Sequence, residues 1–266
     1  MKKTTKREAA ETSLYNRRMH IDLLFEDEHL LAANKPAGLL AHASRMASDV
    51  DVDLLDTLRQ QVGGNIHLVH RLDRATSGLV LAARSSEMAA LLGRQFMERS
   101  VQKVYLGVVR GWPAAVGEID YALPDVREDS PRKPALTRFR TLATATVPIA
   151  LGKYPEQRYA LVEVSPHTGR YRQIRKHFHH VSHHLIGDTS HGRTEHNRLF
   201  KSEFGVHQLL LHARHLLFDH PLDGRRMQLT APLDPVWQNL LSRLGWQEPG
   251  VDTTCLSSVV PTAAVH

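Results

Sequence analysis

The sequence predicts an α+β fold with a mixed, largely antiparallel sheet and flanking helices. Segments that alternate between apolar and polar residues, as half-buried strands do, recur along the whole chain. Segments with helical periodicity lie between them at irregular intervals rather than after every strand, which disfavours a regular series of parallel βαβ units. The chain also shows no internal repeat. These observations favour one irregular α+β sheet over a doubly wound or repetitive architecture.

The first third of the chain predicts strands, a short helix and one polar loop. Residues 21–36, IDLLFEDEHLLAANKP, predict two strands around a polar turn. Residues 54–62 predict a short amphipathic helix that ends at the glycine pair 63–64. The stretch HRLDRATSG, residues 70–78, predicts a loop, and the apolar run at 79–83 predicts a buried strand.

The remaining elements follow from the same two periodicities. Ser85 is a good N-cap residue, and the apolar spacing after it predicts a helix that continues to Arg99. The other expected elements are a strand at 103–109, a charged loop at 122–136, a strand at 158–164, a basic helix at 171–183, a strand at 209–218 and a helix at 234–244.

Charge and apolar content divide the chain into three parts. Residues 1–20 carry a net charge of +4 without apolar periodicity, and we expect them to form a basic disordered arm. Residues 21–248 hold the predicted elements and are expected to be one catalytic domain, while residues 249–266 are expected to be a disordered tail. The chain has a net charge of +6, so only +2 remains outside the arm. A nucleic-acid site in the domain must therefore come from locally clustered arginines.

Composition indicates a cytoplasmic protein. Hydrophobic residues make up 42% of the 266 residues and charged residues 23%, which is ordinary for a soluble globular enzyme. No apolar stretch approaches the roughly 20 residues that span a bilayer, and the N-terminus has no apolar signal core. Cys255 is the only cysteine, so an internal disulfide is impossible, as is usual in a reducing compartment.

Several enzyme classes lack their motifs. The chain has no phosphate-binding glycine loop, no GxSxG and no HExxH. HFHHVSHH, residues 177–184, gives His179 and His183 the spacing of metal ligands on a helix, but this segment has no carboxylate or cysteine to complete a site. Asp188 is the nearest residue that could do so. We favour a second interpretation, in which this helix presents a cationic face to RNA phosphates.

The residues of HRLDRATSG permit a structural or a catalytic interpretation. An aspartate between Arg71 and Arg74 is most often a member of an ion-pair patch. Asp73, however, precedes an apolar strand that can hold it rigidly, and an arginine partner would keep it ionised. A positioned carboxylate is a competent nucleophile at a sugar or base carbon. The basic stretch TGRYRQIR, residues 168–175, could supply the partner.

Six motifs in order resemble those of the RluA-like pseudouridine synthases. HRLDRATSG resembles the signature motif of that family. The other motifs are NKPAGLLAH (34–42), QKVYLGVVRG (102–111), TGRYRQIRKH (168–177) and the late segments HLIGDTSHG (184–192) and LLLHARHLLFDHP (209–221). The resemblance covers roughly residues 22–247. It implies the pseudouridine synthase catalytic fold with a central RNA-binding cleft, and no cofactor or metal.

The resemblance also implies roles for individual residues. Asp73 matches the catalytic aspartate that attacks the flipped uridine, at the base or at the ribose. Tyr105 matches the tyrosine that stacks on the base and helps to remove the C5 proton, and Arg175 matches the basic partner of the aspartate. Arg71 matches the arginine that fills the gap left by the extruded base. Arg74, Arg170, Arg172 and Lys176 are the further RNA-binding candidates; Arg172 replaces the histidine usual at its position.

The substrate expected from the resemblance is tRNA. Residues 148–170 and 196–213 are most similar to the branch of the family that modifies uridine 65 of certain tRNAs. Ribosomal RNA or another tRNA position is the alternative target. A non-catalytic RNA-binding module and a metal-dependent hydrolase that uses the histidines are the competing functions. We expect a monomer without an obligate protein partner and without membrane attachment.

Overall fold

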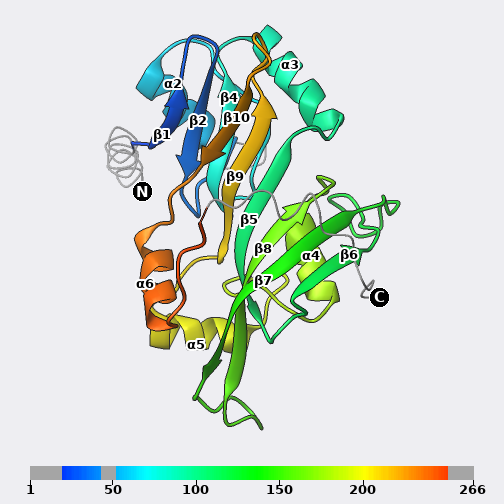
Figure 1. Ribbon diagram of the computed structural model, residues 1–266, viewed down its shortest axis with the longest axis vertical. Coiled ribbons are helices and arrows are strands. Elements are labelled where there is room, and N and C mark those ends of the chain that lie inside the picture. The colour runs from blue at the N-terminus through cyan, green and yellow to red at the C-terminus, as the bar shows by residue number, and fades with distance from the viewer. Residues whose placement is uncertain (1–19, 43–51, 251–266) are drawn as a thin grey trace, which may run out of the picture.

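The computed structural model describes residues 20–42 and 52–250 and confirms the predicted α+β fold. One ten-stranded sheet runs through the described residues in the order β1-β2-β4-β9-β5-β8-β7-β6, with β3 beside β4 and β10 beside β9 (Figure 1). All strand pairs in it are antiparallel except β4 with β9. Residues 1–19 of the expected arm and 251–266 of the expected tail lie outside the description.

Apart from the two-residue strand β3, which was not predicted, the strands of the N-terminal half agree with the sequence prediction to within a few residues. β4 begins two residues before the predicted strand, so Ser77 and Gly78 belong to it. The elements of this half are β1 (Leu23–Glu26), β2 (Leu30–Lys35), α2 (Leu54–Val62), β3 (His67–Leu68), β4 (Ser77–Ala83), α3 (Ser86–Met97) and β5 (Gln102–Arg110).

The C-terminal half contains four elements that were not predicted. They are β6 and β7 on either side of the charged loop, the helix α5 and the strand β10. The elements are β6 (Val116–Asp120), β7 (Leu136–Val147), β8 (Gln157–Pro166), α4 (Gln173–His180), α5 (Thr194–Phe204), β9 (Leu211–Asp219), β10 (Arg226–Thr230) and α6 (Pro235–Arg243). No helix of the described part is both long and apolar enough to cross a membrane.

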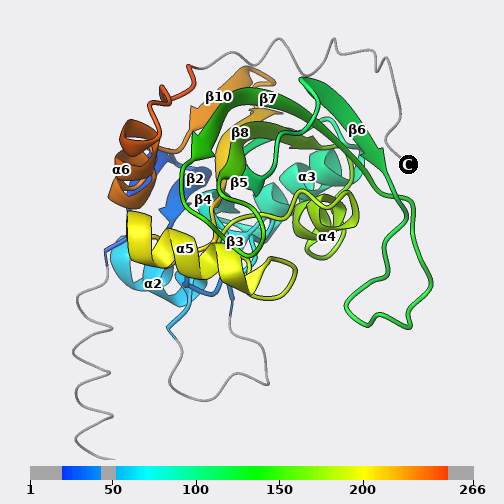
Figure 2. The same ribbon diagram turned by 90° about the horizontal axis from the view of Figure 1, so that it is seen from below.

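Helices cover both faces of the sheet because successive strand residues point to opposite sides. In the N-terminal half, α2 packs on the face that carries Leu31 and Val80, and α3 packs on the face that carries Leu30 and Leu79. In the C-terminal half, α5 and α6 cover the face of Leu106, while α4 covers the opposite face (Figures 1 and 2). The sheet is therefore the shared centre of four apolar clusters.

Local chemistry fixes the helix ends. The side chains of Asp53, Ser85 and Asp234 accept backbone N–H bonds at the starts of α2, α3 and α6, as N-cap residues do. Gly63 ends α2, as the glycine pair predicts.

The basic helix α4 is shorter than predicted. It spans Gln173–His180 rather than residues 171–183, because Arg172 before it and Ser182 after it have left-handed backbones with φ of 53° and 60°. His183 lies beyond the helix and does not share a helical face with Arg175.

Strand register brings the motifs together. Gly78, at the start of β4, lies opposite Ala213 of β9, and Ala213 lies opposite Tyr105 of β5. Tyr105 in turn lies opposite Val164 of β8, the strand that leads into α4. A Cβ on Gly78 would lie 2.3 Å from the Ala213 carbonyl oxygen, so only glycine permits this close approach. The loop before β4, the middle of β5 and the start of α4 consequently meet at one place.

Candidate active site

A buried lysine fixes the loop that carries Asp73. Lys35 is fully buried, and its Nζ donates to the carbonyl oxygens of Leu39 (2.8 Å), Pro36 (2.9 Å) and Arg74 (3.2 Å). Burial lowers the pKa of Lys35 to about 7, although the charge of Asp73 acts to raise it. The loop closes on itself through the Thr76 amide, which donates to the Asp73 carbonyl oxygen at 3.1 Å. These contacts give the Asp73 side chain a fixed base.

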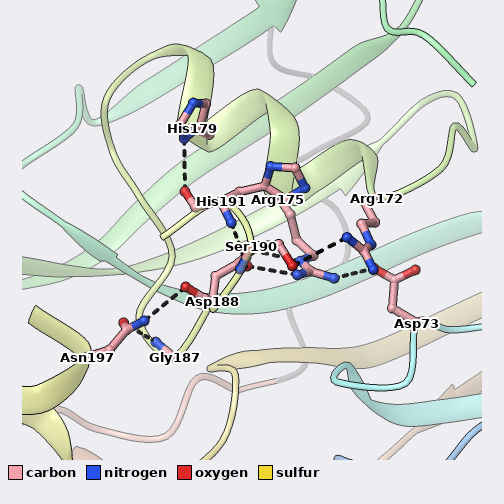
Figure 3. A network of polar contacts seen from close by, with 9 residues as sticks. All are labelled: Asp73, Arg172, Arg175, His179, Gly187, Asp188, Ser190, His191 and Asn197. Atoms are coloured by element: carbon pink, nitrogen blue, oxygen red, sulfur yellow. Dashed lines mark hydrogen bonds and ion pairs between the residues drawn. The ribbon is translucent and has the colours of Figure 1, made fainter. Parts of the chain in front are cut away.

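Arg175 on α4 joins two carboxylates. Its Nη1 donates to Asp73 Oδ2 at 3.0 Å, while Nε and Nη2 each donate to Asp188 at 2.7 Å (Figure 3). The Arg175 side chain is 5% exposed and that of Asp73 is 22% exposed. Burial acts to lower the pKa of Arg175, but the two carboxylates raise it overall. Arg175 is thus a fixed cation beside a carboxylate that solvent or substrate can reach.

Asp188 belongs to the turn after α4 and is buried. Its Oδ1 also accepts the amides of Ser190 and His191 at 2.9 Å each, and its carbonyl oxygen accepts Asn197 Nδ2 at 2.9 Å (Figure 3). Burial alone would raise the pKa of Asp188, but the bonds from Arg175 and the two amides lower it overall. Asp188 therefore stays ionised and fixes the orientation of Arg175.

Tyr105 stands beside this pair on β5. Burial raises the pKa of its phenol, and the negative charge of Asp73 raises it further. The phenol accordingly keeps its proton at neutral pH. Tyr105 is partly exposed and lines the same cavity as Asp73, so its ring offers a flat apolar surface next to the carboxylate.

A cavity of about 520 Å³ opens over these residues, and it is large enough for a nucleobase with its ribose. The structure brings all three predicted catalytic residues, Asp73, Tyr105 and Arg175, to its wall. The predicted RNA-binding residues Arg71, Arg170 and Arg172 also line it.

The last two predicted RNA-binding residues lie elsewhere. Arg74 lines a second cavity on the other side of the Asp73 loop, and its Nε donates to the Gly38 carbonyl oxygen at 2.9 Å. Lys176 is buried on α4, where its Nζ lies 2.9 Å from Glu128 Oε1. It lines neither cavity.

Four of the five histidines of the 177–184 segment bond to backbone carbonyl oxygens, and the fifth, His180, stacks on the Tyr121 ring. His179 Nδ1 donates to the His191 carbonyl oxygen and His183 Nδ1 to that of Arg110, at 2.9 Å each. Asp188 is committed to Arg175. Within residues 20–42 and 52–250, no group of three or more His, Cys, Asp or Glu side chains is arranged to hold a metal ion.

Comparison with known families decides the assignment. The family model described as RNA pseudouridylate synthase matches residues 29–180. The chain belongs to this family. Family membership confirms the resemblance predicted from the motifs and, with it, the enzyme class, an isomerase. The matched region contains Asp73, Tyr105 and Arg175 and ends before Asp188.

Individual relatives support the family assignment. The chain is 42% identical over 236 residues to tRNA pseudouridine synthase C of Pectobacterium carotovorum subsp. carotovorum, which covers 85% of the chain and 63% of that relative. It thus spans less than two thirds of that protein's length. It is 40% identical over 235 residues to tRNA pseudouridine synthase C of Yersinia pestis, covering 85% of the chain and 91% of that protein.

A solved structure shares the fold of this pseudouridylate synthase. Human RNA pseudouridylate synthase domain containing 4 superposes with a TM-score of 0.66, covering 92% of this chain and 100% of that one at 23% sequence identity. This likeness confirms the pseudouridine synthase catalytic fold.

Sequence reasoning missed the residues that support the site. Asp188 was considered only as a metal ligand, and Lys35, Gln173 and Asn197 were given no role. Gln173 joins β7 to α4, because its Nε2 donates to the Leu136 carbonyl oxygen while its Oε1 accepts the amide of Arg170. Lys35, Gln173 and Asp188 lie inside motifs quoted above, and Asn197 lies in the stretch 196–213, but contacts across the fold determine their roles.

Proposed function

We propose that this protein isomerises uridine to pseudouridine in tRNA, at uridine 65, with Asp73 as the nucleophile. The observation that carries the proposal is the continuous chain from Asp73 through Arg175 to Asp188 at the wall of a nucleoside-sized cavity. Two further facts support it: the family assignment, and the relatives named tRNA pseudouridine synthase C. Uridine 65 rests on the resemblance of residues 148–170 and 196–213.

The reaction needs a carboxylate that remains ionised and can reach the base or the sugar. Arg175 holds Asp73 through Oδ2, and among the described residues no other side chain forms a hydrogen bond or ion pair with the Asp73 carboxylate. Oδ1 can then attack C1′ of the ribose or C6 of the uracil. The N1–C1′ bond breaks, the uracil turns, and the C5–C1′ bond forms. The C5 proton leaves and N1 gains a proton, so no electrons are exchanged and no cofactor or metal is included.

Tyr105 and Arg175 have different tasks in this proposal. The uracil stacks on the Tyr105 ring. The phenol is protonated in the resting enzyme, so it first donates a hydrogen bond, and it can help to remove the C5 proton only after it has lost its own proton. Arg175 balances the charge of Asp73 in the resting enzyme. It also stabilises the carboxylate again when the covalent intermediate breaks down.

RNA binding is assigned to the basic residues at and around the two cavities. Arg71 is exposed and lines both cavities, as expected of the side chain that fills the vacated stack. Arg74, Arg170, Arg172 and Lys176 are proposed to contact the RNA backbone. We expect the protein to act as a monomer in the cytoplasm, without a membrane or an obligate protein partner.

The test is pseudouridine mapping on defined RNAs. Purified protein is incubated with a tRNA transcript that has uridine at position 65, with the same transcript carrying cytidine there, and with ribosomal RNA. A pseudouridine at position 65 of the first transcript alone supports the proposal. Modification of ribosomal RNA or of another tRNA position would show the alternative target. Binding without modification of any RNA would favour a non-catalytic module.

A further inference from the structure

Lys176 is an unusual cation because it is buried but not well bonded. Its side chain is 8% exposed, and its ammonium faces Glu128 Oε1 at 2.9 Å. In the described part of the chain, Nζ has no acceptor in good hydrogen-bond geometry, so the contact with Glu128 is electrostatic. Nζ also lies 5.6 Å from the centre of the Tyr171 ring, a cation–π contact that supplies no acceptor oxygen. An ammonium has three N–H donors, so Nζ can accommodate a further oxygen besides that of Glu128.

Glu128 approaches Lys176 from the loop between β6 and β7. Its side chain is 73% exposed, and the ion pair with Lys176 lowers its pKa, with a smaller contribution from His191. The base of the loop is fixed, because Leu123 and Lys133 pair through their backbones. Figure 2 shows this green loop extending from the body beyond α4. The carboxylate is therefore carried by the outer part of a loop and can be displaced without breaking the base.

His191 adds a second buried donor at the same place. In the described ranges, its Nε2 is buried and has no hydrogen-bond partner, and the ring contributes to the lowered pKa of Glu128. The His191 amide donates to Asp188, so the residue belongs to the turn that orients Arg175 (Figure 3). Lys176 directly follows Arg175 on α4. Two buried nitrogens, Lys176 Nζ and His191 Nε2, thus belong to residues next to Arg175 or in the turn that orients it, and both residues interact electrostatically with the exposed Glu128 carboxylate.

We propose that Lys176 and His191 form a subsite for one backbone phosphate of the RNA substrate, and that Glu128 occupies this subsite in the RNA-free protein. A carboxylate and a phosphate both offer anionic acceptor oxygens to such donors, and phosphate offers more of them. The subsite adjoins Arg175, so it would bind a phosphate next to the reacting nucleotide. This inference rests on the proposed function, because it takes RNA as the ligand.

The subsite makes a specific prediction about charge. Removal of the Glu128 carboxylate should favour RNA binding more than removal of an equal charge nearby, because only Glu128 competes with the phosphate. Asp129 is the matched control, since it is the exposed next residue and forms no ion pair with any described residue. We expect Glu128→Gln to lower the Kd for a tRNA transcript by about threefold to fivefold, and Asp129→Asn to change it by less than about twofold.

The lysine itself supplies the second comparison. In a Lys176→Met background, Glu128→Gln and Asp129→Asn should have equal effects on Kd. Lys176→Met alone should reduce the steepness of the plot of log Kd against log salt by roughly 0.7 to 0.9, the loss of one phosphate contact. Equal effects of Glu128→Gln and Asp129→Asn in the wild-type background would overturn the subsite, as would an unchanged salt dependence in Lys176→Met.

Binding and chemistry separate the two proposals. If the wild type forms pseudouridine but Glu128→Gln and Asp129→Asn bind tRNA with the same Kd, the proposed function is supported and the proposed subsite is wrong. If the wild type binds tRNA and forms no pseudouridine in any RNA, the proposed function falls while the Kd comparison still decides the subsite.

Discussion

Asp188 accepts two hydrogen bonds of 2.7 Å from Nε and Nη2 of Arg175, and Nη1 of the same guanidinium donates to Asp73 at 3.0 Å. Arg175 is thus bonded more closely to Asp188, which is not proposed to react, than to Asp73, the proposed nucleophile. Because Asp188 fixes the plane of the guanidinium, the direction of the third bond toward Asp73 is fixed as well. Asp188 thus positions the proposed nucleophile, Asp73, without contacting it directly, through the Arg175 guanidinium.

Loss of Asp188 should therefore affect both stability and turnover. We expect Asp188→Asn to lower the free energy of unfolding by about 3 kcal/mol, because it leaves the buried Arg175 charge poorly compensated. We also expect kcat to fall more than KM changes, since the RNA contacts stay in place. Urea unfolding and steady-state kinetics measure both effects. Glu118→Gln, which removes a partly exposed ion pair with Arg138, is the control and should cost less than about 1 kcal/mol.

The planar, forked geometry of the Arg175 guanidinium should contribute to turnover in addition to its charge. Arg175→Lys keeps a cation but cannot bond both Asp188 oxygens and Asp73 in one plane. The loss of one charge-assisted hydrogen bond of about 1.5 to 3 kcal/mol corresponds to a fall in kcat of roughly tenfold to a hundredfold. Single-turnover pseudouridine formation at saturating enzyme would measure it. A lysine variant with wild-type kcat would show that charge alone is sufficient.

Gly187 should be required for steric reasons. It precedes Asp188 with φ of 80°, and a Cβ there would lie 1.9 Å from the Gln208 carbonyl oxygen. Gly64 has a similar φ of 74° but open space around it. We expect Gly64→Ala to cost about 1 kcal/mol, the backbone penalty alone, and Gly187→Ala to cost about 3 kcal/mol or more. If thermal or urea unfolding gave the same loss of stability for Gly187→Ala and Gly64→Ala, the turn at Gly187 would be able to move away from the added Cβ at no cost.

Acid should destabilise the fold before its carboxylates are protonated. Burial lowers the pKa of His177, His196, His212 and His215 from 6.5 to about 4, and that of His70 to about 3. Between pH 6.5 and pH 4 the unfolded chain therefore binds more protons than the folded one, and stability falls as pH falls. Urea unfolding at pH 7.5 and pH 5 should differ by at least about 2 kcal/mol. Constant stability across this range would mean that these histidines bind protons equally in the folded and unfolded states, so that burial does not lower their pKa.

The sequence predicted the strands better than the contacts between them. Alternation at 21–36 and 103–109 is a local property, so β1, β2 and β5 were expected close to where they lie. α5 was missed because the expected signals are weak there: Arg193, at its N-cap, forms no side-chain cap bond. β7 was missed because half of its residues are only partly buried and its pairing with β6 is non-local.

For the site, motif matching named the three residues that the fold brings to one cavity, but it did not predict the residues that pack behind them and hold them in place. Asp73, Tyr105 and Arg175 were each named from a motif, and the register of β4, β9 and β5 brings them to one cavity. Asp188 was not foreseen as the partner of Arg175, because nothing local marks a carboxylate that is to be buried against a distant arginine. Lys176 was expected at the RNA surface, whereas the fold buries it behind Glu128.

The most direct test of the central claim compares the wild type with Asp73→Asn. The asparagine has nearly the same shape and can still accept a bond from Arg175, so folding and tRNA affinity should stay close to wild type, as unfolding and binding curves would verify. Release of the C5 hydrogen from tritiated uridine in tRNA reports the reaction itself. We predict no detectable release by Asp73→Asn under single-turnover conditions. Release at the wild-type rate would contradict the assignment of Asp73 as the nucleophile.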